Sequence, residues 1–171
     1  MFRRNFLKSS IIGSLSASTI MSLTNKNNPI VKSVPRIIST WKHGVNANKI
    51  AWKKLNNGEG GLTAVEFGVR DSENDPNERS VGYGGLPDRE GKVTLDACIM
   101  DSNNDCGSVS FLENIKNPIS VARLVMEKTP HIMLSGKGAY DFAIENGFKS
   151  ENLLTEQSKK DWENWLKKSE Y

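Results

Sequence analysis

The sequence predicts a layered fold of helices and short strands, of the α/β or α+β class. Residues 93–100 alternate apolar and other side chains with the period of two that is typical of a β-strand. Stretches with helical apolar spacing, such as residues 119–126, alternate with short β-branched runs along the chain. The 171 residues are 37% hydrophobic and 25% charged, which indicates one globular domain and not a disordered chain.

The formal net charge of +3 comes from the first few residues. Arg3, Arg4 and Lys8 account for all of it, because the other 20 of the 23 basic residues balance the 20 acidic ones. A neutral remainder offers no electrostatic surface to a phosphate backbone. We therefore exclude nucleic acid as a partner.

Residues 3–8 (RRNFLK) match the twin-arginine export pattern, and an apolar run over 11–23 follows them. That run is short and is diluted by Gly13, Ser14, Ser16 and Ser18, so it predicts a removable signal and not a membrane anchor. We predict a signal peptide and linker over residues 1–28, a single region over 29–171, and a periplasmic or secreted protein.

Three elements are predicted in the first half of that region. Residues 36–41 (RIISTW) form a β-branched strand that ends on Trp41. Asn46 caps a helix over 47–55, and a second helix over 63–72 is expected to bury Val65 and Val69, with Phe67 as a further candidate. The acidic residues around its end lack the spacing of a calcium loop and predict a solvated helix end: Asp71, Glu73, Asp75 and Glu78.

A hairpin is the predicted centre of the sheet, with strands over 93–100 and 108–112 and a turn over 101–107. Neither face of the first strand is strongly polar, so we expect both faces to be covered, with helices on both sides. The remaining elements follow from caps and apolar spacing. They are a helix over 117–129, a strand over 131–134, a turn over 136–138, a helix over 139–146 closed by Gly147, and a helix over 158–168 whose first turn pairs Ser158 with Asp161.

Asp96 is the carboxylate most in need of an explanation, because it lies in the middle of a predicted buried strand. It either accepts backbone hydrogen bonds from the glycine-rich turn or lies at the rim of a polar pocket. Trp41 is similarly either a core residue or a pocket residue at a strand end. The glycine-rich residues 82–85 lack the lysine and hydroxyl of a phosphate-binding loop, so a turn is predicted there.

Metal and redox chemistry have weak sequence support. His43 and His131 have no ligand partner at metal-binding spacing, so no metal site and no cofactor are predicted. Cys98 and Cys106 flank the hairpin turn and could form a disulfide in an oxidising compartment, although strand-paired cysteines often have unsuitable geometry.

Several ordered blocks of residues 29–171 resemble the glycosylasparaginases, which are N-terminal-nucleophile hydrolases. The blocks are residues 39–41 (STW), 80–101, 107–109 (GSV), 117–123 (NPISVAR), 126–131 (MEKTPH) and 151–155 (ENLLT). The resemblance implies an α+β fold that is a portion of a four-layer α-β-β-α sandwich. It also implies a precursor that cuts itself before a threonine and then hydrolyses the amide of N-glycosylated asparagine. Trp41 and Asp96 match the family's substrate-binding tryptophan and aspartate, and His43 stands where the family has an aromatic ring.

The same resemblance places the nucleophilic threonine beyond Tyr171, so no catalytic residue is assigned in this chain. The implied partner is the β subunit, or missing C-terminal half, of the same precursor, in an oligomer of α/β units. Alone, the chain would leave an apolar sheet face and open edges, which predicts poor solubility. The alternatives are an asparaginase or isoaspartyl peptidase of the same superfamily, and an inactive fragment that serves only in binding or structure.

Overall fold

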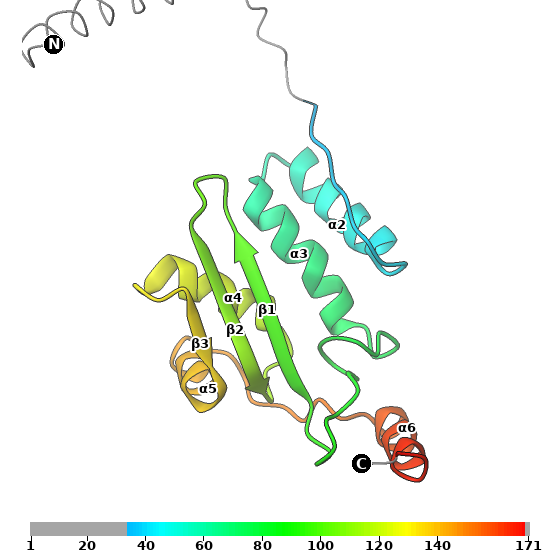
Figure 1. Cartoon of the computed structure of the whole chain (residues 1–171). Helices are drawn as coiled ribbons and strands as arrows, with labels where there is room; N and C mark the ends of the chain where they lie inside the picture. Colours follow the sequence, from blue (N-terminus) through cyan, green and yellow to red (C-terminus); the bar gives the residue numbers. More distant parts are fainter. Residues whose placement is uncertain (1–33, 170–171) are drawn as a thin grey trace, which may run out of the picture. The chain divides into compact units, whose positions relative to one another are not determined.

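The computed structural model describes residues 34–169, so the predicted signal peptide over 1–28 lies outside the described residues. The chain divides into two units, Met1–Arg36 and Ile37–Tyr171, and the second holds every helix and strand considered below. With the labels of Figure 1, its elements are α2 (Gly44–Asn56), α3 (Gly61–Asn74), β1 (Thr94–Met100), β2 (Cys106–Glu113), α4 (Pro118–Lys128), β3 (Met133–Ser135), α5 (Gly136–Glu145) and α6 (Glu156–Leu166).

The sheet has the order β1-β2-β3, with β1 and β2 antiparallel and β2 and β3 parallel. The predicted hairpin is confirmed, and so is the mixed class of helices and strands. Leu95 pairs with Leu112 and Ala97 pairs with Val109, so Asp96 alone faces two residues of β2. One of these two, Phe111, has a φ of 51°, which makes this a β-bulge with a left-handed residue.

One face of the sheet packs on the core. Ile99, Val109 and Leu112 contact buried residues of α4 and α5, including Val121, Ala122, Val125, Ala139 and Ala143. Figure 1 shows α4 crossing behind the hairpin. Helix α4 begins as predicted with Pro118 in its first turn, and buries an almost continuous stripe because it lies between the sheet and α3.

The opposite face of the sheet is open in the described part of the chain. Asp96 and Cys98 are exposed there, and so are the apolar side chains of Met100, Phe111 and Met133, each more than half exposed. The prediction that both faces are covered is therefore wrong for residues 34–169. The side chains of β1 have little polar character on either face, and the described residues supply helices to only one of them.

The predicted strand over 36–41 is also wrong. Residues 34–39 adopt no regular element, and Thr40 and Trp41 lie in a bend before α2. Ile38 is 88% exposed and Trp41 72% exposed. A β-branched run becomes a strand only where a neighbouring strand pairs with it, and the described sheet offers this run no partner.

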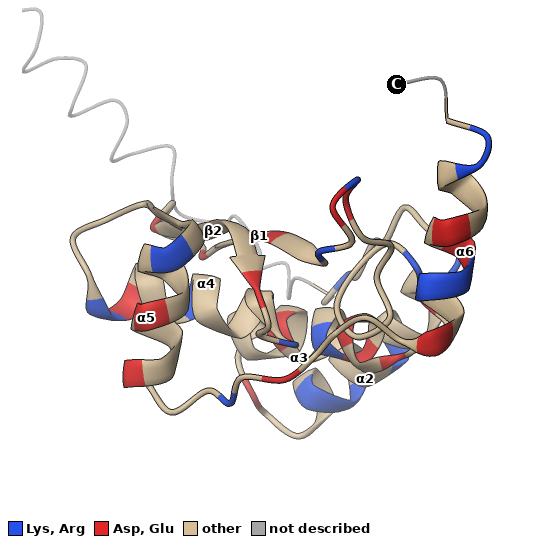
Figure 2. Ribbon diagram, turned by 90° about the horizontal axis from the view of Figure 1, so that it is seen from below, with Lys and Arg blue, Asp and Glu red and all other residues tan. Residues whose placement is uncertain are grey.

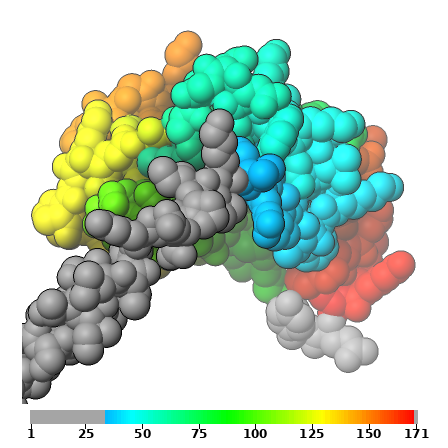
Figure 3. Space-filling model, turned by 90° about the horizontal axis from the view of Figure 1, so that it is seen from above, coloured from blue at the N-terminus to red at the C-terminus, as the bar shows by residue number. Residues whose placement is uncertain are grey.

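Helices α2 and α3 pack closely through small residues, and Figure 3 shows their surfaces side by side. A Cβ on Gly68 would lie 2.9 Å from the carbonyl oxygen of Ala47, so only glycine permits this approach. Ala51 and Ala64 are buried at the same interface, whereas Val65 is 52% exposed. The predicted burial of Val65 is wrong. The backbones of α2 and α3 lie so close together that the face of α3 towards α2 carries small residues, and Val65 lies outside that face. Val69 does pack against the core.

Several element ends differ from the prediction. Helix α2 begins at Gly44 after His43, so Asn46 lies within it. Helix α5 begins at Gly136, inside the predicted turn, and α6 is capped by the Thr155 hydroxyl, which accepts from Ser158 N–H.

Figure 2 shows basic and acidic residues mixed along α5 and α6, in keeping with the neutral balance of the sequence. No helix among the described residues has the length and apolar character needed to cross a bilayer.

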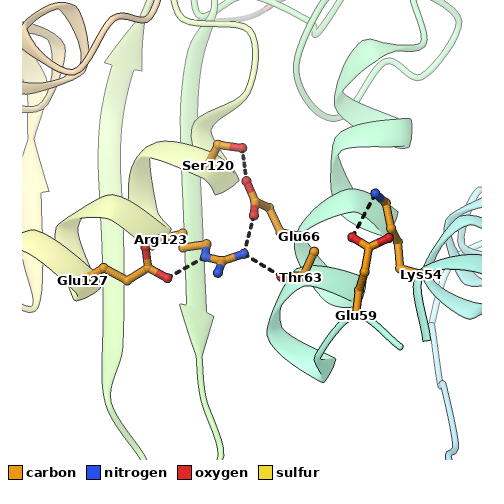
Figure 4. A network of polar contacts seen from close by, with 7 residues as sticks. All are labelled: Lys54, Glu59, Thr63, Glu66, Ser120, Arg123 and Glu127. Carbon is orange, nitrogen blue, oxygen red and sulfur yellow. Dashed lines mark hydrogen bonds and ion pairs between the residues drawn. The ribbon is translucent and has the colours of Figure 1, made fainter. Parts of the chain in front are cut away.

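A polar network joins α3 to α4 on the side of the sheet that packs on the core (Figure 4). Glu66 is only 8% exposed, and its carboxylate accepts from Ser120 Oγ and, at 2.8 Å, from Arg123 Nη1. Arg123 Nη1 also donates to Thr63 Oγ1 at 3.1 Å, and Arg123 Nε donates to Glu127 at 2.7 Å. Every bond at this buried carboxylate comes from α4, so the network fixes how α3 and α4 are aligned.

Replacing Glu66 with alanine is expected to reduce the free energy of unfolding by about 2–4 kcal/mol, because the Ser120 hydroxyl and one side of the Arg123 guanidinium would lose their partner in a buried site. Urea unfolding measures the change. Asp141→Ala is the control, since Asp141 pairs with Lys137 at the surface of α5 and should contribute less than about 1 kcal/mol. Equal effects of the two substitutions would contradict this account of the network.

Candidate functional site

Asp96 lies on the open face of the hairpin, at the bulge. Its Oδ1 accepts the backbone N–H of Phe111 at 2.8 Å. The bulge leaves that amide unpaired in the ladder, and Asp96 supplies the missing acceptor. The sequence suggested backbone hydrogen bonds from the glycine-rich turn, but the donor comes from β2. This bond holds one carboxylate oxygen in place while the side chain remains exposed.

A pocket of about 290 Å³ runs along β1 beside Asp96. Its lining comes from three segments that are distant in sequence: β1 itself, the loop before it, and the facing ends of α3 and α4. The lining residues are Val69, Glu73, Ser80, Val81, Thr94, Leu95, Asp96, Ala97, Cys98, Pro118 and Ile119. Asp96 therefore lines a pocket, as one reading of the sequence expected. The other reading, a buried acid bonded to the glycine-rich turn, is wrong, because Asp96 is exposed and its backbone donor lies in β2.

Trp41 and His43 line a second pocket of about 220 Å³. Their rings are parallel within 9°, with centroids 6.3 Å apart. Trp41 is therefore a pocket residue and not a core residue, as its 72% exposure also shows. Val69 and Val81 line both this pocket and the one beside Asp96. The structure thus brings the three predicted residues, Trp41, His43 and Asp96, to two pockets with a common wall.

The loop between α3 and β1 contributes Val81 to that common wall, and close contacts require the glycines that follow it. Gly82 has a φ of 59°, and a Cβ there would lie 2.0 Å from the carbonyl oxygen of Glu73. Tyr83 N–H donates to the same carbonyl oxygen at 2.8 Å. The next glycine, Gly84, has a φ of 92° and lies against Pro76. The glycine-rich motif is a turn, as predicted, and it packs the pocket wall against the end of α3.

Glu73 is a site residue that the sequence did not reveal. It was predicted to lie at a solvated helix end, but it is only 2% exposed. Its carboxylate accepts from Ile119 N–H at 3.0 Å and from Asn117 Nδ2 at 3.2 Å. It thereby caps α4 from a neighbouring helix, since the Asn117 side chain makes no cap of its own. Proximity of the acidic cluster to a glycine-rich loop was the only sequence signal, and it was not specific.

Burial raises the pKa of Glu73 to about 7, against the opposing effects of the hydrogen bonds from Ile119 and Asn117 and of the charge on Arg70. Around neutral pH the carboxyl of Glu73 is therefore partly protonated and partly ionised. The same residue lines the pocket of Asp96. Glu78, in the loop after α3, behaves differently. Burial by itself would raise its pKa, but hydrogen bonds from Ser80 and the neighbouring His43 outweigh that effect and lower it.

The described residues support binding chemistry in the two pockets. No group of three or more His, Cys, Asp or Glu side chains within residues 34–169 is arranged to hold a metal ion. Cys98 and Cys106 are both free thiols. Cys98 pairs with Ser108, and Cys106 pairs with Met100, so the two cysteines are offset and do not form the disulfide considered above. His131 is exposed and lines neither pocket.

Other hollows lie apart from these pockets. One of these hollows, of about 390 Å³, is lined by residues that include Trp162 and Trp165 of α6. The carboxylates there are already engaged: Asp161 pairs with Arg79 at 2.7 Å, and Asp88 accepts the N–H groups of Glu90 and Lys92. The three predicted site residues do not line it. The candidate site is therefore the paired pockets along β1 and α2.

Comparison with known proteins identifies the family of this chain. The sequence model of the asparaginase family matches residues 16–171, and the chain belongs to this family. An N(4)-(β-N-acetylglucosaminyl)-L-asparaginase of Elizabethkingia miricola is 56% identical over 174 aligned residues, covering 99% of this chain and 51% of its own length. A protein of the same name from Rattus norvegicus is 41% identical over 148 residues, covering 86% of this chain and 41% of its own. The chain thus spans about half the length of these relatives.

Proposed function

We propose that this chain supplies the N-terminal part of an amide hydrolase that cleaves N4-(β-N-acetylglucosaminyl)-L-asparagine into aspartate and an aminosugar. The observation that carries the proposal is the common wall of Val69 and Val81, which places the aromatic pair and Asp96 in adjacent pockets. The names of the two relatives point to the same substrate. An aromatic pair beside a fixed carboxylate suits a ligand with a sugar at one end and an amino acid at the other.

In this proposal the chain binds and orients the substrate, and the reacting groups come from a segment equivalent to the other half of the relatives. Trp41 and His43 contact the sugar, and Asp96 faces the asparagine part. The nucleophile is a threonine that becomes N-terminal when the precursor cuts itself, with its own α-amine as the base. The added segment would supply a second sheet against the open face of β1 and β2, which completes a four-layer α-β-β-α sandwich.

The proposal also covers assembly and localisation, and it has one competing activity. The assembled enzyme is an oligomer of α/β units. The twin-arginine pattern over residues 3–8 directs it to the periplasm or the medium. An asparaginase or isoaspartyl peptidase activity competes with the main reading, because His43 offers the sugar a smaller ring than the family's aromatic residue. Rates on glycosylasparagine, asparagine and an isoaspartyl dipeptide, measured on one preparation, would rank these activities.

The direct test combines this chain with the remaining half of the Elizabethkingia miricola relative, co-produced so that a complete protein forms. We expect release of aminosugar and aspartate from glycosylasparagine. A complex that is folded and fully assembled, yet hydrolyses none of the three substrates, would leave the inactive binding fragment as the better reading.

Asp96→Asn in that complex is expected to lower kcat/KM by roughly 100-fold, equivalent to about 2.7 kcal/mol of transition-state stabilisation. The amide oxygen of Asn can still accept the Phe111 N–H, so the melting temperature should barely change, whereas Asp96→Ala should also destabilise the bulge by about 1 kcal/mol. Asp141→Asn, on the surface of α5, is the matched control and should keep full activity. Full activity of Asp96→Asn would remove this residue from the site.

A further inference from the structure

His43 occupies an unusual place for a ligand-binding ring. It is the N-cap residue of α2, yet its side chain forms no capping hydrogen bond with the helix. The imidazole is instead held by a residue of another segment, since His43 Nδ1 lies 2.7 Å from Oε2 of Glu78. This contact and the parallel alignment with Trp41 define the orientation of the ring.

Glu78 lies in the loop between α3 and β1, which contributes Val81 to the common wall. Its second carboxylate oxygen, Oε1, accepts from Ser80 Oγ at 2.7 Å and from Ser80 N–H at 3.3 Å. Both oxygens are therefore engaged, Oε2 by His43 and Oε1 by Ser80. A carboxylate held in this way resists rotation, so it can fix the orientation of a ring that it contacts.

The two ends of this chain of contacts belong to different pockets. His43 lines the pocket of Trp41, and Ser80 lines the pocket of Asp96. A single carboxylate thus joins the aromatic side of the site to the side that carries the aspartate. The lowered pKa of Glu78 keeps it charged at neutral pH, where it attracts the Nδ1 proton of the imidazole.

We infer that Glu78 is a positioning residue, which holds the Nδ1–H tautomer of His43 and leaves Nε2 as the acceptor for a hydroxyl or amide donor of the sugar. This inference rests on the proposed function for the identity of the ligand. The tautomer itself does not depend on that function, because a carboxylate that accepts from Nδ1 leaves the lone pair of a neutral imidazole on Nε2.

The first arm of the test measures the tautomer by ¹⁵N NMR on protein labelled at histidine, with the His43 signal assigned by its loss in His43→Gln. At pH 8 the wild-type signal should show protonated Nδ1. Glu78→Ala should move it towards protonated Nε2, and Glu78→Gln should preserve it, because the amide oxygen can accept the same proton. An unchanged tautomer in Glu78→Ala would overturn the inference, whatever the enzyme hydrolyses.

The second arm measures kinetics in the complete protein. Glu78→Ala should raise KM for glycosylasparagine by about 5- to 10-fold with kcat within about twofold, and Glu78→Gln should largely restore KM. KM for asparagine, which has no sugar, should not change. Glu59→Ala is the matched control, since Glu59 pairs with Lys54 at 3.1 Å and lines neither pocket. An equal loss on both substrates, or a loss confined to kcat, would refute a role on the sugar side.

Discussion

Gly107→Ala is expected to remove most of the stability of the fold. A Cβ on this residue would lie 2.2 Å from the carbonyl oxygen of Ala122 and 2.5 Å from the backbone nitrogen of Met126. Both obstacles are backbone atoms of α4, so no rotamer change can relieve the overlap. Strand β2 would have to move away from α4, which forms the core with it. We expect a loss of at least about 4 kcal/mol in the free energy of unfolding.

Gly138→Ala is the matched control for this substitution. Gly138 lies in the first turns of α5, and a Cβ there meets no atom within 4 Å. Alanine is the better helix former, so this variant should be neutral or more stable by up to about 1 kcal/mol. Urea unfolding, followed by far-ultraviolet circular dichroism, compares the two. A Gly107→Ala protein as stable as the Gly138→Ala protein would show that β2 and α4 are not packed as described.

Glu73→Gln is expected to change how stability depends on pH. In the folded protein burial raises the pKa of Glu73 to about 7, from 4.5 when unfolded. Between these values the folded state holds a proton that the unfolded state has lost, so the stabilising contribution of Glu73 is complete below pH 4.5 and is lost as pH rises through 7. From pH 5 to pH 8 this loss is on the order of 2–3 kcal/mol.

Glutamine has nearly the same shape and cannot ionise, so it should remove this pH-dependent loss. It keeps an oxygen to accept the Ile119 N–H, although Asn117 would have to adjust to an amide group. The free energy of unfolding of Glu73→Gln relative to wild type should therefore increase from pH 5 to pH 8. Glu145→Gln, at an exposed position of α5, should show no such increase. A constant difference between Glu73→Gln and wild type at both pH values would mean that Glu73 does not titrate in this range.

The central elements followed from the sequence because local signals were consistent with the final packing. The alternation over residues 93–100 predicted β1, and Pro118 with the apolar stripe after it predicted α4. The predictions failed where a neighbouring segment decided the outcome. Residues 36–41 have strand-forming side chains and no strand to pair with, and Val65 was displaced from the inner face by the closeness of α2 and α3.

The site shows the same division. Trp41, His43 and Asp96 were selected from residue types and a family resemblance, and these are properties of the sequence. Their arrangement in adjacent pockets depends on segments that are distant in sequence meeting in space. So do the bond from Phe111 to Asp96 and the contact between His43 and Glu78, which join residues 15 and 35 positions apart. Glu73 illustrates the physical reason most clearly. A glutamate at a helix end is normally solvated, and here α4 and the glycine-rich loop fold over it, so tertiary packing alone turned a surface acid into a buried cap with a raised pKa.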